Sequence, residues 1–206
     1  MTPVNSGEQR PKPRRQGIKV FGGLVTLLLI GWFVYASINI LNPSQGTSQA
    51  RADAVVSLAP QSQRLPVAQQ LIADGVADTL VISYFDHDSM NHEPGTSNAT
   101  MWLQSYCESE AEYEIVCFTP DEDATIGEAS GIAALGHERA WESLTVVTDT
   151  THVFRTRFLM DECLGDDFDV NVVVAERELD ASAKAWYVIY ENAAFVKAFW
   201  QAAWRC

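Results

Sequence analysis

Basic residues are scarce in this chain of 206 residues, and five of them lie within the first 19 positions. The chain has 14 Lys and Arg side chains against 27 Asp and Glu, a net charge of -13. Residues 1–19 carry a net charge of +4, whereas residues 20–206 hold 9 basic and 26 acidic side chains, a net charge of -17. Such an acidic surface repels phosphate backbones, so the composition argues against nucleic acid as a partner.

Several catalytic and nucleotide-binding motifs are also missing. The sequence contains no Gly-x-Ser-x-Gly nucleophile elbow, no P-loop and no glycine-rich dinucleotide fingerprint. Its four cysteines include no Cys-x-x-Cys pair, so the dithiol and zinc motifs built on that spacing are absent as well. With 47% hydrophobic and 20% charged residues, the chain nevertheless has the composition of a folded protein.

An uncharged apolar segment occupies residues 20–41. Its 22 residues are enough to cross a hydrocarbon core of about 30 Å at roughly 1.5 Å per residue, which predicts a transmembrane helix. The basic tail precedes it, so the positive-inside rule predicts a cytoplasmic N-terminus. A cleaved signal peptide is the alternative, although its apolar core is normally only about 7–15 residues. We expect a single-pass plasma-membrane protein with a linker over 42–50 and an extracytoplasmic domain over 51–206.

The four cysteines favour the same placement. In an oxidising compartment, an even set without metal-binding spacing forms disulfides more often than it stays reduced. Of the three possible pairings we favour Cys107 with Cys117, which closes a short loop, and Cys163 with Cys206, which would fix the C-terminal residue. Each bond would contribute about 2–4 kcal/mol. Four unpaired buried thiols are the alternative.

Beyond residue 51, short apolar segments alternate with helical patterns. We expect strands over 54–59, 79–83, 113–118, 143–148 and 169–175, each followed by a helix, over 64–74, 97–108, 125–139, 151–164 and 180–204. The strands are nearly continuous Val, Ile and Leu, as is typical of parallel strands covered on both faces. The sequence therefore predicts an α/β fold, a Rossmann-like three-layer sandwich with a mainly parallel five-stranded sheet, preceded by one transmembrane helix.

Local residue chemistry agrees with these boundaries. Pro66 is expected near the start of the first domain helix, where its missing N–H costs nothing. Gly75 is expected just past the end of that helix, in the left-handed conformation that glycine tolerates. Thr125 and Glu128 match a capping box at the start of a later helix.

The segment after the fourth strand contains the best candidate for a ligand site. Ligands of such sheets bind beyond the carboxyl ends of the strands, where the strand order reverses. Hydroxyl groups and unpaired N–H groups at a helix start suit an anion, and His152 and Arg155 share a helical face there. The structural alternative is that the threonines cap the helix, His152 is a surface residue and Arg155 pairs with Asp149.

The order of these segments resembles the YdcF-like, or SanA/ElyC-like, family (domain of unknown function 218). The resemblance rests on ADAVVSLA, an arginine five residues on, TLVIS, a Thr-x-x-Glu helix start and VVTDTTHVFRTRF. It covers about residues 53–175, and the paired cysteines and N-terminal anchor are similar to those of actinobacterial members. It implies a polar site gathered at the ligand edge of the sheet from Asp53, Arg64, Ser83, Thr125, Glu128, Thr148, His152 and Arg155.

Two hypotheses follow from this site. In the first, the protein is an envelope enzyme or enzyme-like protein that handles an anionic small molecule or lipid-linked precursor of cell-wall or surface-polymer assembly. Arg64 and Arg155 would clamp a phosphate or carboxylate, His152 would act as acid or base, and Glu128 would orient a partner group. No nucleophile and no cofactor is indicated.

In the second hypothesis, the protein is a non-catalytic binding or scaffold module with a degenerate site. Where many members of the family have glycines, this chain has Ala59 and Pro60 after the first strand, and Tyr84 and Phe85 after Ser83. Glycines let a backbone approach a ligand closely, so their replacement favours an altered site.

The loop after the second strand is rich in residue types that bind metals. Its carboxylates and imidazoles belong to Asp86, His87, Asp88, His92 and Glu93. They show no regular ligand spacing, so we expect a solvated loop and no metal site.

Overall fold

The computed structural model describes residues 14–44, 46, 51–85 and 99–206. It divides into two units, Met1–Ala36 and Ser37–Cys206. The helix α1 (Arg14–Leu41) contains the segment Lys19–Leu41, which is long and apolar enough to cross a membrane. The predicted span over residues 20–41 therefore coincides with a continuous helix.

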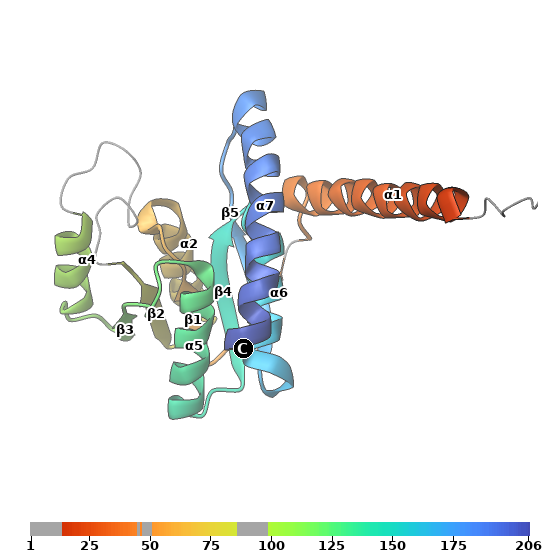
Figure 1. Cartoon of the computed structure of the whole chain (residues 1–206). Helices are drawn as coiled ribbons and strands as arrows, with labels where there is room; N and C mark the ends of the chain where they lie inside the picture. Colours follow the sequence, from red (N-terminus) through yellow and green to blue (C-terminus); the bar gives the residue numbers. More distant parts are fainter. Residues whose placement is uncertain (1–13, 45, 47–50, 86–98) are drawn as a thin grey trace, which may run out of the picture. The chain divides into compact units, whose positions relative to one another are not determined.

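The second unit is built on a five-stranded sheet in which all strands are parallel (Figure 1). Its strands are β1 (Ala54–Ser57), β2 (Thr79–Ser83), β3 (Glu114–Phe118), β4 (Ser143–Asp149) and β5 (Asp169–Ala175). Their order is β3-β2-β1-β4-β5, so β1 pairs with β2 on one side and with β4 on the other. The strand order reverses between β1 and β4, and the predicted α/β fold with five parallel strands is confirmed.

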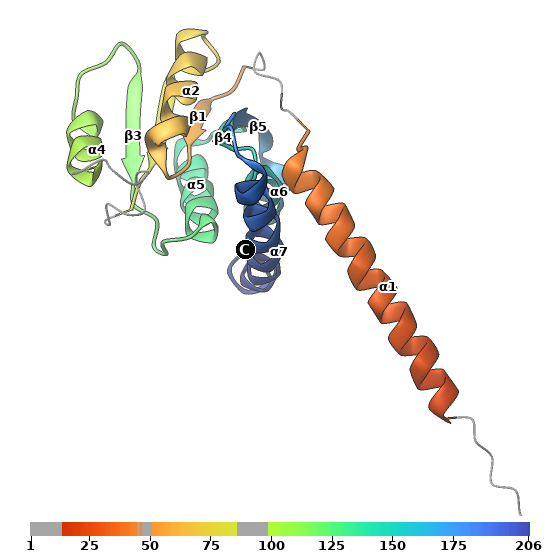
Figure 2. The ribbon, with the colours of Figure 1, turned by 90° about the horizontal axis from the view of Figure 1, so that it is seen from above.

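Helices cover both faces of this sheet. They are α2 (Gln61–Ala73), α4 (Ala99–Cys107), α5 (Thr125–Arg139), α6 (Val153–Leu164) and α7 (Ala181–Arg205), with a short 3-10 turn at Gly165–Asp167. Figure 2 shows α2 on one side of the strands and α5, α6 and α7 on the other. This arrangement explains the near-continuous apolar strands, because every residue of β1 and β2 is buried.

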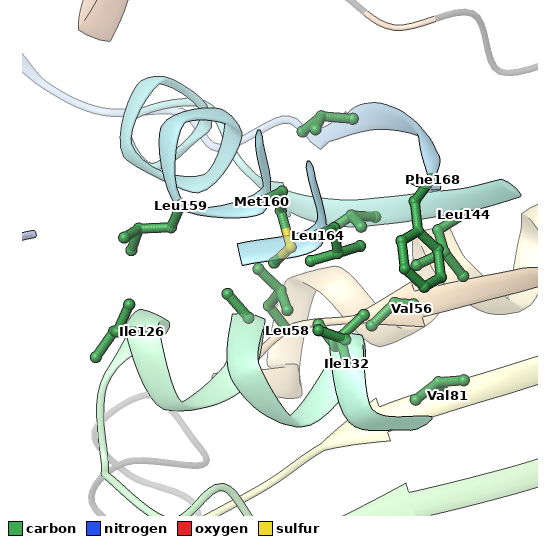
Figure 3. Packing of buried hydrophobic residues seen from close by; sticks show 14 of the residues in the cluster. Val56, Leu58, Val81, Ile126, Ile132, Leu144, Leu159, Met160, Leu164 and Phe168 are labelled. Atoms are coloured by element: carbon green, nitrogen blue, oxygen red, sulfur yellow. The ribbon is translucent and has the colours of Figure 1, made fainter. Parts of the chain in front are cut away.

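Alternate residues of each strand point to opposite faces of the sheet, and each face has its own hydrophobic core. Val56 and Leu144 point into the core between the sheet and helices α5 and α6, where Figure 3 shows them with Ile132 and Met160. Val55 and its neighbours on the opposite face pack with α2. The period of two along each strand thus distributes apolar side chains to both helical layers.

Most predicted boundaries match the structure within two residues, and β2, α5 and β5 match it completely. The exception is α2, which begins at Gln61, three residues before the predicted start, so Pro66 lies inside the helix and not in its first turn. Gly75 has the expected positive φ of 77°. Residues 97 and 98, assigned to a helix from the sequence, lie outside the described residues.

Both predicted disulfide pairings are present. Cys107 at the end of α4 is bonded to Cys117 in β3, with Cα atoms 5.9 Å apart. Cys163 near the end of α6 is bonded to Cys206, directly after α7, with Cα atoms 4.5 Å apart. The second bond links the end of α7 to α6, which keeps the inner face of α7 against the domain.

Candidate functional site

The carboxyl edge of the sheet holds a pocket of about 330 Å³, here called the switch-point pocket because it lies where the strand order reverses. Its lining includes Glu128 from the first turn of α5, His152 before α6 and Arg155 in α6. Thr125, the first residue of α5, lines it too, so four side chains selected from the sequence meet at one cavity. α7 closes another part of the same pocket with residues that include Tyr190 and Lys197.

Arg155 is the central hydrogen-bond donor of this pocket. Its Nε donates to Glu191 Oε2 at 2.8 Å, and its Nη2 donates to Glu191 Oε1 at 3.2 Å. Its Nη1 donates to Thr125 Oγ1 at 2.7 Å, and its Nη2 also lies 2.5 Å from His152 Nε2. Because Glu191 is only 1% exposed, this fork holds a buried carboxylate between α6 and α7.

The contact between Arg155 and His152 determines which nitrogen of a neutral imidazole carries the proton. A guanidinium has only donors, so Nε2 of His152 must accept, and a neutral ring then carries its proton on Nδ1. That Nδ1 lies 3.6 Å from Asp149 Oδ2 and 3.6 Å from Glu191 Oε1, just beyond hydrogen-bond length. In this arrangement the lone pair of His152 is occupied by Arg155 and is not directed at the pocket as a base.

Arg64 lies behind the pocket and not in its wall. Its side chain is 2% exposed, its Nη2 lies 2.6 Å from Asp149 Oδ2, and its Nη1 donates to the carbonyl oxygen of Ala59. Burial by itself would raise the pKa of the Asp149 carboxyl, but His152 and Arg64 beside it hold this pKa well below its ordinary value. Arg64 therefore bridges the ends of β1 and β4 across the point where the strand order reverses.

Glu128 is an acidic side chain of the pocket with a raised pKa. Burial raises it, and the nearby Arg64, the Ala59 N–H and the Ser83 hydroxyl only partly oppose this shift. Glu128 Oε1 accepts the hydrogen bond from the Ala59 N–H at 2.8 Å. A carboxyl group in this setting favours its protonated form, which can donate as well as accept.

The predicted capping box is wrong. The residue before α5 is Ala124, which forms no side-chain cap, and Thr125 is the first residue inside the helix. The Thr125 hydroxyl accepts from Arg155, and Oε1 of the Glu128 carboxyl group accepts from the Ala59 N–H. Both side chains that matched the local capping motif are therefore used by distant partners at the pocket.

The remaining predicted site residues divide between the two edges of the sheet. Ser83 ends β2 and Thr148 is the last but one residue of β4, so both lie at the carboxyl edge, and the buried Oγ1 of Thr148 has no hydrogen-bond partner among the described residues. Asp53 lies at the opposite edge, where its Oδ2 accepts from the N–H groups of Glu142 and Ser143. The structure thus separates Asp53 from the other candidates and gives it a role in holding the start of β4.

Two carboxylates of this site were not selected from the sequence. Asp149 was considered only as a partner of Arg155, whereas it pairs with Arg64. Glu191 belongs to a helix that we expected to pack against the sheet. It lies on the same helical stripe as the buried Phe195 and Ala198, so an acidic residue within the apolar stripe was the available signal.

The residues of the metal-ligand-rich loop, 86–93, lie outside the described residues. Among the residues that the structure does describe, no group of three or more His, Cys, Asp or Glu side chains could hold a metal ion.

Comparisons with protein-family models, with curated proteins and with solved structures found no match for the chain.

Proposed function

We propose that the chain is a membrane-anchored, extracytoplasmic YdcF-like protein that binds or acts on an anionic small molecule or lipid-linked precursor of cell-envelope biogenesis. The observation that carries the proposal is the meeting of Glu128, His152 and Arg155 in one cavity where the strand order reverses. The resemblance of residues 53–175 to the family suggests the envelope as the setting. The disulfides and the candidate membrane span are compatible with it.

The charges around the switch-point pocket support an anionic ligand. Arg155 and Lys197 line it, and Asp123 is the acidic lining residue beside the buried Glu128. Four of the five N–H groups of Arg155 are engaged by described residues, which leaves one on Nη1 for a ligand. The ligand would also displace Arg155 from His152 if it accepted from Nη2.

Binding is tested with the full chain in detergent, by thermal unfolding with inorganic phosphate, phosphate monoesters and short carboxylates. A ligand at 100 times its Kd stabilises the folded state by about 2.7 kcal/mol. The paired variant Arg155→Met with Glu191→Leu removes the guanidinium without leaving a buried charge. The matched control is Arg157→Met, because Arg157 lies in the same helix but donates to Ser44.

We expect the anion-dependent rise in Tm to disappear in the paired variant and to remain in Arg157→Met. An equal response in both proteins would place the anion elsewhere and contradict the proposal. The role in the envelope is tested separately, by asking whether His152→Ala restores the stress tolerance of a deletion strain. Full restoration would exclude His152 as an essential acid or base.

The non-catalytic alternative is favoured by one specific contact. Because Arg155 donates to His152 Nε2, the imidazole cannot accept a proton at that atom until the contact breaks. A ligand that stabilises the protein and is recovered unchanged after prolonged incubation would support this second function. Formation of a product would exclude it.

A further inference from the structure

The outward side of α7 carries a row of exposed aromatic and aliphatic side chains. We call this row the outer face of α7, and its members, which are 53% to 84% exposed, are Trp186, Ile189, Val196, Trp200 and Trp204. They recur at spacings of three, four and seven residues, which places them along one side of the helix. The buried residues of α7, which include Phe195, Ala198 and Ala202, occupy the opposite side.

The inner side of α7 already accounts for how this helix is held in the domain. Phe195 packs against Phe154 and Phe158 of α6, with ring centroids 4.8 Å apart in both pairs. The disulfide from Cys163 to Cys206 fixes the end of the helix. The outer face is not needed for these contacts, and an exposed apolar row of this length marks an interaction surface.

The chain that follows the candidate membrane span is held against the same part of the domain. Arg157 of α6 donates to the Oγ and carbonyl oxygen of Ser44, at 2.5 and 2.7 Å. The N–H of Gly46 donates to the carbonyl oxygen of Val172 at 3.0 Å, an approach so close that a Cβ at Gly46 would clash with it. Only Asn42 and Pro43 lie between Leu41 and Ser44, so three steps along the chain, a reach of about 10 Å, join the two residues. The end of the span and α6, the neighbour of α7, are therefore close together.

The charges of α7 differ from those of the rest of the domain. Residues 20–206 carry a net charge of -17, yet the exposed charged side chains within Ala181–Arg205 are all basic, namely Lys184, Lys197 and Arg205. The acidic Glu191 of this helix is buried. Lys197 and Arg205 share one carboxylate partner, Glu122, so these three side chains together keep a charge of about +1, and Lys184 adds another positive charge to α7.

From these observations we infer that the outer face of α7 lies on the lipid surface of the membrane that α1 crosses, and this inference rests on the proposed membrane anchorage. Tryptophan is the residue most suited to the boundary between headgroups and acyl chains, and lysine and arginine attract anionic headgroups. The same helix contributes Tyr190 and Lys197 to the switch-point pocket. Docking would hold that pocket about one helix diameter, roughly 10 Å, from the headgroups, where a lipid-linked anion would reach it.

The test uses the full chain in nanodiscs of phosphatidylcholine with one quarter phosphatidylglycerol, with or without bromine in the upper part of one acyl chain. Bromine quenches tryptophan fluorescence only on contact with lipid. The test variant carries Trp186→Gln, Trp200→Gln and Trp204→Gln. The matched control is Trp102→Gln, since Trp102 is 55% exposed but lies in α4, which packs on β3.

We expect the quenched part of the emission to fall by more than half in the triple variant. The three tryptophans of α7 are then gone, and only Trp32, which lies in the candidate membrane span of α1, would still contact lipid. Trp102→Gln should leave the quenched part of the emission unchanged. The single change Trp204→Gln, at a side chain 84% exposed, should give a smaller fall and guards against misfolding of the triple variant.

Three results would overturn the inference. Equal quenching in the wild type and the triple variant would show that only Trp32 contacts lipid. A second result would be two chains per disc, with fluorescence of the α7 tryptophans that is blue-shifted but not quenched by bromine. The outer face of α7 would then be an interface between copies of the chain. Chains that separate from the discs altogether would overturn the membrane anchorage itself, and this result is distinct from the other two.

Discussion

Ion pairs of the same chemical type lie in opposite settings at the two edges of the sheet. At the amino edge, Arg51 and Asp78 are 3.5 Å apart, with 76% and 93% of their side chains exposed. At the carboxyl edge, Arg64 and Asp149 are 2.6 Å apart, with 2% and 13% exposed. Water surrounds the first pair and is largely excluded from the second.

This difference supports the proposal that the charges of the carboxyl edge serve a ligand. An exposed pair contributes about 0–1 kcal/mol, whereas a buried pair loses so much hydration that apolar residues are often as stabilising. A cluster of buried charges at the carboxyl edge is therefore costly for folding alone. Its position at the reversal of strand order is the one at which such sheets bind ligands, which supports a functional role for Arg64, Asp149, Arg155 and Glu191.

The largest predicted effect comes from removing one partner of a buried pair. Glu191→Ala leaves the Arg155 guanidinium buried without its carboxylate, and we expect a loss of about 3–5 kcal/mol in the free energy of unfolding. Urea denaturation under non-reducing conditions measures it. The paired change Arg155→Met with Glu191→Leu should recover most of the loss. A cost below about 1 kcal/mol for Glu191→Ala would mean that the pair behaves like an exposed one.

The next effect is the change of stability with pH, which should have opposite signs for Glu128 at the carboxyl edge and Asp53 at the amino edge. Burial holds the pKa of Glu128 above its ordinary value, so its contribution to stability is fully present below the unfolded pKa of about 4.3. That contribution is lost as the pH rises through the raised pKa of the folded state. Glu128→Gln keeps the acceptor for the Ala59 N–H but cannot ionise. We expect the wild-type free energy of unfolding to fall with rising pH relative to that of the variant.

Asp53 at the amino edge should show the opposite sign. Hydrogen bonds from the Glu142 and Ser143 N–H groups outweigh burial and lower the pKa of Asp53. Its contribution is therefore present above the unfolded pKa of about 3.9 and is lost as the pH falls through the lowered pKa. Denaturation curves for Glu128→Gln and Asp53→Asn across the acidic range compare the two signs directly. Parallel pH profiles for these variants would contradict the assigned environments.

The fold was predictable from the sequence because its signals are local. Continuous apolar strands, a glycine after α2 and turn residues between elements identify β2, α5 and β5 to the residue. The candidate site was predictable only where it follows the strands. His152, Arg155 and Glu128 come directly after or near strand ends, and parallel strands bring those ends to one edge.

The features of the site that could not be predicted from the sequence depend on contacts between residues far apart in the chain. Glu191 reaches Arg155 from a position 36 residues later, through the packing of α7 on α6. Thr125 and Glu128 match a local capping motif, yet their side chains accept hydrogen bonds from Arg155 and from the Ala59 N–H. A site is where local rules are most often broken, because its side chains are held for a ligand and not for the helix that carries them.

A smaller effect is expected from Asp53→Ala at the amino edge. The change removes the acceptor of three hydrogen bonds at the start of β4, two from backbone N–H groups and one from the Ser143 hydroxyl. Because Asp53 is exposed, water replaces these bonds in part, and we expect a loss of about 1 kcal/mol in the free energy of unfolding. Urea denaturation measures this, and anion-dependent stabilisation should be unchanged. Loss of anion binding in Asp53→Ala would mean that Asp53 belongs to the ligand site after all.

The smallest effect should come from Arg51→Ala, which breaks the exposed pair with Asp78. Water solvates both groups once they separate, so we expect a change within about 0.5 kcal/mol, and Asp78→Ala should match it. Denaturation at low and high salt checks this, since screening weakens exposed pairs far more than buried ones. A loss above 1 kcal/mol that persists at high salt would remove the contrast between the edges. The burial of Arg64 and Asp149 would then no longer support the proposal that charge at the carboxyl edge serves a ligand.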